Sequence, residues 1–269
     1  MNGPETETPH IRFFCWQPTD ETRPRLPPDE LHVWLVEAHE ANLGARPWLE
    51  DLSGDERQRV GRFRFAVHRN QFMLGRGVLR HRLAAGLGCA PREVRFVYGS
   101  HGRPELDPAL NPTGVVFSVS HVPGLVVLAF ALRRRLGVDV ETSQRVGDWR
   151  ALASRALSVR ERAVLAALPP GSQTAGFLRA WTAKEAFLKA TGRGLTDDLD
   201  RLETEVNPAL PVRLLALGEA PDEPESRSWA GGTHCATAPF GFRDEADRWT
   251  LRSFSLGADR LATLAWAAL

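Results

Sequence analysis

Two acidic residues, two positions apart on an apolar segment, are the first sign of chemistry in this chain. They are Asp139 and Glu141, in the run Gly137-Val138-Asp139-Val140-Glu141. On a strand both carboxylates face the same way, while Val138 and Val140 point into a core. Carboxylates this close resist joint ionisation unless a cation lies between them, and hard oxygen ligands suit Mg²⁺. The pair is therefore either a magnesium site or a strand end that carries two solvated acids.

A third carboxylate, Glu185, lies on a segment that is predicted to be a helix from about Thr174 to Thr191, since Gly192 follows it. Glu185 and Lys189 are four residues apart and are therefore neighbours on this helix. They form either a surface salt bridge or the carboxylate and the cation of a functional site.

The segment from Arg57 to Arg82 contains many arginines and no acid, which predicts an anionic ligand nearby. The arginines are at positions 57, 59, 62, 64, 69, 76, 80 and 82. Phe63, Phe65 and Phe72 lie among them, and their spacing is that of core positions rather than of a surface on which bases stack. The stretch therefore favours a small polyphosphate over nucleic acid.

Two further segments present groups that can bind phosphate. Gly102-Arg103-Pro104 is a predicted tight turn that exposes one more guanidinium, whose forked donors suit phosphate. The segment Phe117–His121 ends a buried strand, so Ser120 and His121 emerge at its carboxyl end. Adjacent strand residues point to opposite faces, which argues against a nucleophile and base couple and favours phosphate binding. A structural role is the alternative for His121.

The composition bounds the remaining possibilities. The 269 residues are 43% hydrophobic and carry a formal net charge of +1, which gives no global field for nucleic acid or a membrane. Cys15, Cys89 and Cys235 form no CxxC pair, which predicts a reducing compartment, the cytoplasm. Met1–His10 has no apolar run of a secretory signal, and polar residues interrupt Val115–Leu132, which predicts two strands rather than a membrane span.

The distribution of prolines and apolar segments predicts three regions. Residues 1–30 are proline-rich and are expected to be a flexible extension, and two subdomains follow at 31–135 and 136–269. Strands are expected at 32–36, at 249–254 and at 261–267, with a loop at Gly218–Gly232.

The two subdomains match each other at a fixed offset of 105 residues. The matches include Leu52, Ser53 and Glu56 in the first, and Leu157, Ser158 and Glu161 in the second. Ser158 to Glu161 is a capping box, which favours a structural role for Glu161. The same register places Arg80 opposite Glu185, so arginines and carboxylates would face each other. We therefore expect an α+β fold of two similar α/β subdomains, related by a pseudo-two-fold axis, with the active site in the cleft between them.

In this order and spacing, the segments F-S-V-S-H, G-V-D-V-E and W-T-A-K-E-A-F-L-K resemble the Sfp-type 4′-phosphopantetheinyl transferases over roughly residues 31–269. By this resemblance, the chain would move the phosphopantetheine arm of coenzyme A onto a serine of an apo acyl or peptidyl carrier protein. The reaction would need Mg²⁺ and release adenosine 3′,5′-bisphosphate. Arg57 and Arg59 replace lysines that are common in the family, which keeps the charge.

The resemblance implies a role for each matching residue. Asp139, Glu141 and Glu185 would hold Mg²⁺ against the pyrophosphate, while Lys189 and His121 would contact phosphate and stabilise developing charge. The other coenzyme A contacts would be Arg59, Arg69, Arg103, Ser120 and Lys184. The proton of the attacking serine would go to Glu185 or Glu141, and we expect Glu185 because Lys189 beside it would favour the ionised form.

Alternatives to this function are a non-catalytic module that binds coenzyme A or a carrier protein, and a nucleic-acid binder that uses the arginine-rich stretch. The carrier would belong to fatty-acid, polyketide or nonribosomal-peptide synthesis and would dock near Thr142–Arg150. Because one duplicated chain contains both sides of the cleft, we expect a monomer.

Overall fold

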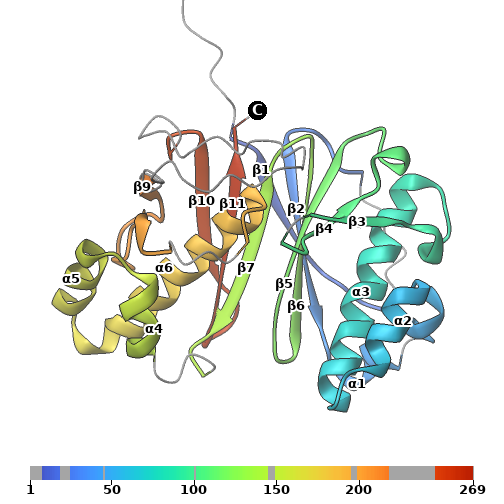
Figure 1. Cartoon of the computed structure of the whole chain (residues 1–269), viewed down its shortest axis with the longest axis horizontal. Helices are drawn as coiled ribbons and strands as arrows, with labels where there is room; N and C mark the ends of the chain where they lie inside the picture. Colours follow the sequence, from blue (N-terminus) through green and yellow to red (C-terminus); the bar gives the residue numbers. More distant parts are fainter. Residues whose placement is uncertain are drawn as a thin grey trace, which may run out of the picture.

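The structure is a computed structural model, which describes residues 8–18, 25–44, 46–99, 101–144, 149–194, 199–217 and 246–268. It is a mixed α+β fold, with the main sheets in the middle and helices on two sides (Figure 1). The predicted loop at Gly218–Gly232, Cys235 and part of the predicted docking segment lie outside the described residues. Within the described ranges, no helix is long and apolar enough to span a membrane.

The first half of the chain forms a four-stranded sheet in the order β1-β2-β6-β5. These strands are β1 (His10–Cys15), β2 (Glu30–Glu37), β5 (Val115–Val122) and β6 (Leu125–Leu132). The other elements are α1 (Glu40–Leu43), η1 (Trp48–Asp51), α2 (Gly54–Gly61), α3 (Ala66–Leu87), η2 (Pro91–Glu93), β3 (Phe96–Tyr98), β4 (Pro104–Leu106) and η3 (Pro108–Leu110). The strands predicted at 32–36 and within Val115–Leu132 are confirmed.

The predicted N-terminal extension is partly wrong, because β1 belongs to the sheet. It pairs in parallel with β2. The ring of Phe14 stacks on Trp34, with centroids 4.5 Å apart, and Trp16 is buried against Trp48. The prolines that suggested a flexible segment flank this strand and are not part of it.

The second half forms a three-stranded sheet in the order β10-β11-β7. Its strands are β7 (Leu136–Thr142), β10 (Trp249–Ser255) and β11 (Arg260–Ala267), so both closing strands are confirmed. The other elements are α4 (Trp149–Ala156), α5 (Val159–Ala167), α6 (Pro170–Thr191), η4 (Leu199–Arg201), β8 (Leu202–Thr204) and β9 (Leu214–Leu217). Helix α6 begins at Pro170 rather than near Thr174, because proline suits the first position of a helix.

The two halves repeat one order of elements. In each half one strand, β2 or β7, pairs antiparallel with the second strand of a later hairpin, β6 or β11. The long helices α3 and α6 each contain 22 residues. Both end at a glycine with left-handed backbone, Gly88 at φ 69° and Gly192 at φ 74°, which a side chain would disfavour. The sequence offset therefore corresponds to a repeated topology.

A buried ion pair under a capping box is also present in both halves. Glu56 lies 2.6 Å from Arg80 on α3, and Glu161 lies 2.5 Å from Lys184 on α6. All four side chains are buried. Arg80 is therefore not among the arginines that the first half was expected to bring to the cleft, because it holds α3 to α2 within that half.

The two sheets meet where β5 lies against β7, and side-chain hydroxyls join these strands. The Val138 amide donates to Ser118 Oγ at 3.0 Å, and the Val140 amide donates to Ser120 Oγ at 3.2 Å. One apolar core spans both sheets behind this junction. It includes Leu31, Val33, Val127, Leu136, Val138, Val140, Leu264 and Trp266.

Candidate active site

Close packing of α6 on β7 brings the predicted site residues together. A Cβ atom at Gly137 would lie 1.9 Å from the carbonyl oxygen of Ala186. The facing helix residues, Ala186 and Ala190, are small and buried. Since neither element has a bulky side chain at this contact, Asp139 on β7 comes within hydrogen-bonding distance of Lys189 on α6.

Asp139 is the centre of a polar cluster to which three elements contribute. Its Oδ1 accepts hydrogen bonds from Lys189 Nζ at 2.7 Å and from Ser120 Oγ at 2.8 Å. Lys189 Nζ also lies 3.0 Å from Ser120 Oγ. Asp139 is only 4% exposed, so this carboxylate is not a solvated group at a strand end.

Glu185 lies one helical turn before Lys189, and its charge interacts with the charges of Asp139, Lys189 and Glu141. Burial and the neighbouring Asp139 raise the pKa of Glu185 to about 7, against the opposite effect of Lys189. Lys189 favours the ionised form of Glu185, as expected, but it does not offset the other effects on this pKa. Burial and two carboxylates outweigh one ammonium.

The carboxylates fit a divalent cation by their chemistry. Asp139 Oδ2 and Glu185 Oε1 are buried and make no hydrogen bond, which is costly unless a cation or a donor compensates. Carboxylate oxygens are ligands that Mg²⁺ prefers. Within the described ranges, no three His, Cys, Asp or Glu side chains are already grouped as ligands of one ion. The donor set therefore suits Mg²⁺, but its coordination shell is not preformed.

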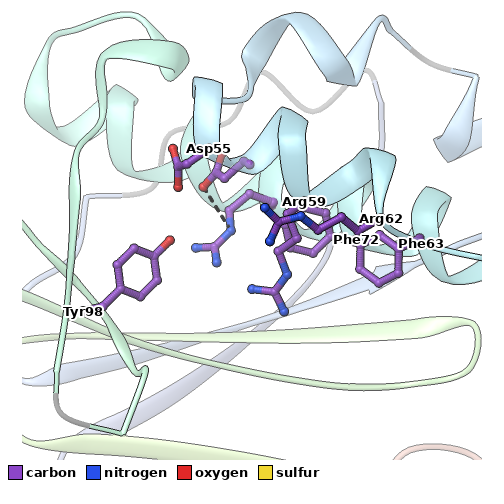
Figure 2. A pocket seen from close by; sticks show the side chains of 8 residues that line it. Asp55, Arg59, Arg62, Phe63, Phe72 and Tyr98 are labelled. Carbon is purple, nitrogen blue, oxygen red and sulfur yellow. Dashed lines mark ion pairs between the residues drawn. The ribbon is translucent and has the colours of Figure 1, made fainter.

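A basic pocket of about 560 Å³ lies in the first half, between α2, α3 and β3 (Figure 2). Its lining consists of three arginines, two acids and three aromatic residues, namely Arg59, Arg62, Arg76, Asp55, Glu56, Phe63, Phe72 and Tyr98. Arg76 pairs with Glu56 at 3.3 Å, so Arg59 and Arg62 supply the remaining positive charge. The Arg59 guanidinium lies 4.9 Å from the centroid of the Phe72 ring. Phe63 and Phe72 thus line a pocket, contrary to the expectation that they belong to the core. Guanidinium groups and rings in one pocket suit a phosphorylated aromatic ligand.

A second pocket, of about 360 Å³, shares Arg59 and Phe72 with the first and extends to His121. His121 is exposed and Ser120 is buried, as expected for adjacent strand residues that face opposite sides. The two pockets therefore lead from the arginines to His121 at the end of β5, on the face opposite to Ser120.

The arginine-rich stretch does not form one surface. Arg69 is exposed on α3 and lines neither basic pocket. Arg80 is buried, and the Arg82 guanidinium stacks on Trp34 at 4.3 Å. Only some of these arginines therefore line the pockets. The stretch includes most of helix α3, and its arginines point in different directions around the helix.

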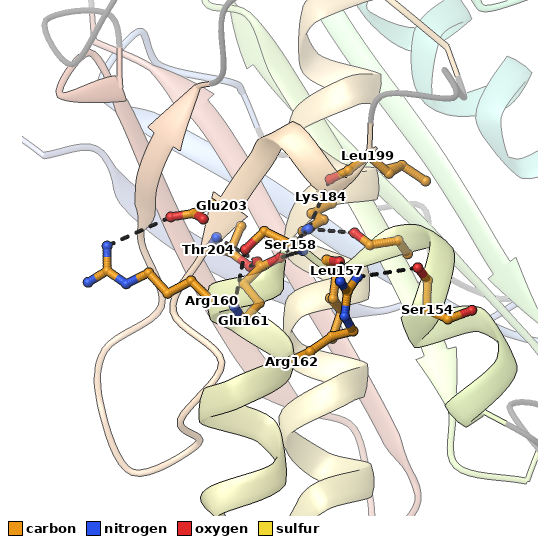
Figure 3. Close-up of polar contacts among 11 residues, drawn as sticks. Ser154, Leu157, Ser158, Arg160, Glu161, Arg162, Lys184, Leu199, Glu203 and Thr204 are labelled. Carbon is orange, nitrogen blue, oxygen red and sulfur yellow. Dashed lines mark hydrogen bonds and ion pairs between the residues drawn. The ribbon is translucent and has the colours of Figure 1, made fainter.

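The predicted coenzyme A contact of Lys184 does not fit the structure. Its side chain has no exposed surface, and its ammonium donates to Glu161 at 2.5 Å, to the Ala156 carbonyl at 2.6 Å and to the Leu199 carbonyl at 2.9 Å (Figure 3). Glu161 also accepts hydrogen bonds from the amide and hydroxyl of Thr204. Lys184 and Glu161 are therefore structural residues that join α4, α5, α6 and β8.

Arg103 also differs from its prediction. Its guanidinium donates to backbone carbonyls of Lys189, Ala190, Phe117 and Leu136 instead of pointing outward. Ser120 likewise directs its hydroxyl to Asp139, and not to either basic pocket. The sequence pattern alone gave no signal for these contacts, because the acceptors are backbone groups of distant segments.

A carboxylate and lysine cluster next to a basic aromatic pocket, at the junction of two repeated halves, defines an enzyme that acts on a phosphorylated substrate. The model of the 4′-phosphopantetheinyl transferase superfamily matches residues 135–238, and that of the N-terminal part of a 4′-phosphopantetheinyl transferase matches residues 46–132.

Individual relatives agree with these models. The 4′-phosphopantetheinyl transferase HetI of Nostoc is 37% identical over 186 residues, which cover 69% of this chain and 78% of HetI. The L-aminoadipate-semialdehyde dehydrogenase-phosphopantetheinyl transferase of Rattus norvegicus is 29% identical over 74% of this chain and 66% of its own length. The AcpT transferase of Escherichia coli O157:H7 is 32% identical over 46% of this chain and 58% of its own length. The chain therefore belongs to the 4′-phosphopantetheinyl transferase superfamily and is a phosphopantetheinyl transferase.

Proposed function

We propose that the chain transfers the 4′-phosphopantetheine arm of coenzyme A to a serine of an apo acyl or peptidyl carrier protein, in a Mg²⁺-dependent reaction that releases adenosine 3′,5′-bisphosphate. The observation that carries the proposal is the cluster of Asp139 and Lys189 beside Glu185, with carboxylate oxygens that are buried and lack hydrogen bonds. Such a cluster is suited to the diphosphate of coenzyme A.

Coenzyme A would extend along the two connected pockets. The adenosine end would lie among Arg59, Phe72 and Tyr98. The diphosphate would lie between His121 and an adjoining pocket of about 260 Å³ that Glu185 and Lys189 line. Arg69, which is exposed on α3, would have to turn toward these pockets to contact a phosphate there. This course would bring the scissile phosphate to the acidic cluster.

Asp139, Glu141 and Glu185 would hold Mg²⁺, which when bound neutralises charge on the diphosphate. The Lys189 ammonium would compensate charge that develops on the leaving phosphate, while His121 would contact phosphate from the other face of β5. Glu185 would accept the proton of the attacking serine, and Glu141 is the alternative base.

We further propose that the halves are subdomains of residues 31–135 and 136–269 that follow a pseudo-two-fold axis, with the site in the cleft between them. The repeated strand order supports this, and so does the change from one family model to the other between residues 132 and 135. A cleft contained in one chain is consistent with a monomer. The cytoplasm is the proposed location, and nucleic acids and membranes are not expected partners.

The test is a mass-shift assay with coenzyme A, Mg²⁺ and apo carrier proteins from fatty-acid, polyketide and peptide synthesis. One carrier at least should gain one phosphopantetheine. Asp139→Asn should lower the rate by about 100-fold or more, because the cation loses a charged ligand. The control is Glu40→Gln, an exposed acid on α1. No adduct on any carrier would contradict the proposal.

The burial of Asp139 also bears on the stability of the protein. An exposed acid at a strand end could be removed at little cost, but Asp139 is buried and bonded to Lys189. Asp139→Asn should therefore also destabilise the protein, by about 1 to 3 kcal/mol. Activity must accordingly be compared at a temperature at which circular dichroism shows both proteins folded.

A non-catalytic module that binds coenzyme A is the second candidate. Such a module would bind coenzyme A with the same affinity whether or not Mg²⁺ is present. Calorimetry with coenzyme A in the presence and absence of Mg²⁺ distinguishes the two, since equal affinities and no carrier adduct would favour the module.

A further inference from the structure

Arg103 contacts three elements that carry the site, although the mechanism above gives it no role. Its guanidinium donates to the carbonyls of Lys189 and Ala190 on α6. It also donates to the Leu136 carbonyl on β7 at 3.1 Å and to the Phe117 carbonyl on β5 at 3.4 Å. One side chain of the β3–β4 hairpin thus connects the helix to both strands.

These carbonyls lie close to the residues of the acidic cluster. Lys189 itself belongs to the cluster, Leu136 precedes Asp139 by three residues on β7, and Phe117 precedes Ser120 by three residues on β5. The positions of the three hydrogen-bonding partners therefore depend on the backbone groups that Arg103 holds.

The end of α6 needs such a contact. The last carbonyls of a helix have no partner within it. The amides of Gly192 and Arg193 both donate to the Leu188 carbonyl, so those two donors do not reach the carbonyls of Lys189 and Ala190. A guanidinium satisfies these carbonyls and complements the negative end of the helix dipole.

His101, on the same hairpin, reinforces the contact. Its Nδ1 lies 3.2 Å from the Gly192 carbonyl oxygen. A Cβ atom at Gly194 would lie 2.7 Å from the His101 side chain, so the turn after α6 packs directly on this histidine. The hairpin of the first half therefore holds the end of α6 at two points.

We propose that Arg103 is a positioning residue, which aligns α6, β5 and β7 so that Lys189, Asp139 and Ser120 meet, and is not a coenzyme A ligand. Its activity readout rests on the proposed function. Lysine cannot replace it, because an ammonium is a single point charge, whereas the planar fork of a guanidinium reaches acceptors on several sides.

The experiment compares Arg103→Lys and Arg103→Gln with wild type. The control is Arg95→Lys, an exposed arginine just before β3 that pairs with Asp107. Both Arg103 variants should lower kcat by about 100-fold, since a small displacement of reacting groups costs that much. The KM and calorimetric Kd for coenzyme A should change by less than about threefold. A nearly wild-type Arg103→Lys, with a Kd raised about tenfold or more in Arg103→Gln, would identify a phosphate ligand and overturn the proposal.

Hydrogen exchange supplies a readout that needs no carrier. Amides of α6 from Ala186 onward should exchange faster in both Arg103 variants and not in Arg95→Lys. Unchanged protection there would overturn the positioning role, and if Arg103→Gln fails to fold, Arg103→Lys decides the question. An inactive wild type would instead contradict the proposed function and leave the exchange result interpretable.

Discussion

At the scale of single residues, the site combines groups whose charges are only partly balanced. One carboxylate oxygen of Asp139 accepts hydrogen bonds from Lys189 and Ser120, and the other oxygen is buried without a hydrogen bond. Glu185 carries a pKa raised to about 7 by burial and by neighbouring carboxylates. Both features support the proposal that a cation completes the cluster.

Binding of Mg²⁺ should therefore displace a proton from Glu185. With a pKa of about 7, this group is about half protonated at neutral pH. The proton competes with the metal, so affinity for Mg²⁺ should fall as the pH drops below about 7 and level off above it. Calorimetry in buffers of different ionisation enthalpy measures the released proton. Affinity that is independent of pH between about 6 and 8 would contradict this, and Glu185→Gln is the control.

Lys184 should matter for stability and not for coenzyme A. Lys184→Met leaves Glu161 buried without its cation and should reduce the free energy of unfolding by about 3 to 5 kcal/mol. The double variant with Glu161→Gln should lose less than the sum of the single changes. Urea unfolding measures both effects, and calorimetry should give an unchanged Kd for coenzyme A. A stable Lys184→Met protein with weakened coenzyme A binding would restore the role that the sequence suggested.

At the scale of elements, the contact of α6 with β7 decides the geometry of the site. Gly137 allows the strand to approach the backbone of the helix so closely that no side chain fits between them. The same approach places Glu185 and Lys189 over the strand that carries Asp139 and Glu141.

Gly137→Ala should separate these elements. The added Cβ atom would overlap the Ala186 carbonyl, so we expect a loss of about 3 kcal/mol and a large decrease in kcat. The matched control is Gly171→Ala, near the start of the same helix, because a Cβ atom at this position would contact nothing. The higher helix propensity of alanine should raise the free energy of unfolding of this variant by about 0.5 to 1 kcal/mol. Thermal unfolding and the carrier assay check both variants. If Gly137→Ala is as stable and active as wild type, the close approach of α6 to β7 is not required.

Elements with strong local patterns were predictable from the sequence, and contacts between distant segments were not. The apolar runs of β5, β6, β7, β10 and β11 predicted strands, and the capping box predicted the start of α5. Strand β1 was missed because prolines surround a short segment that depends on pairing with β2. The acidic motif indicated where the candidate site lies. The side chains of Arg103 and Lys184 point inward because they bind backbone carbonyls and, for Lys184, also Glu161, and the local sequence does not determine where these partners lie.

At the scale of the whole molecule, the two halves share one apolar core although each has its own sheet. Leu31 and Val127 of the first half pack in the same cluster as Leu136 and Trp266 of the second. Separation of the halves would expose this surface to water. The halves are therefore expected to depend on each other for folding.

Urea unfolding should accordingly show one cooperative transition by both fluorescence and circular dichroism. Fragments that end or begin near residue 135 should not fold alone, and mixing them should restore helical structure. Two separate transitions, or one fragment with a cooperative transition of its own, would contradict the shared core.

The hydroxyls of Ser118 and Ser120 on β5 fix the register of β7 against β5. These hydroxyls accept hydrogen bonds from the amides of Val138 and Val140, which are two residues apart on β7. A shift of β7 by one residue would therefore direct both amides away from the hydroxyls. Sliding it by two residues would leave one hydroxyl without its amide and carry Asp139 about 7 Å past Ser120. A chain whose halves dock out of register would therefore lose the contact of Ser120 with Asp139 together with hydrogen bonds that stabilise the junction, so only the correctly folded chain has the complete polar cluster.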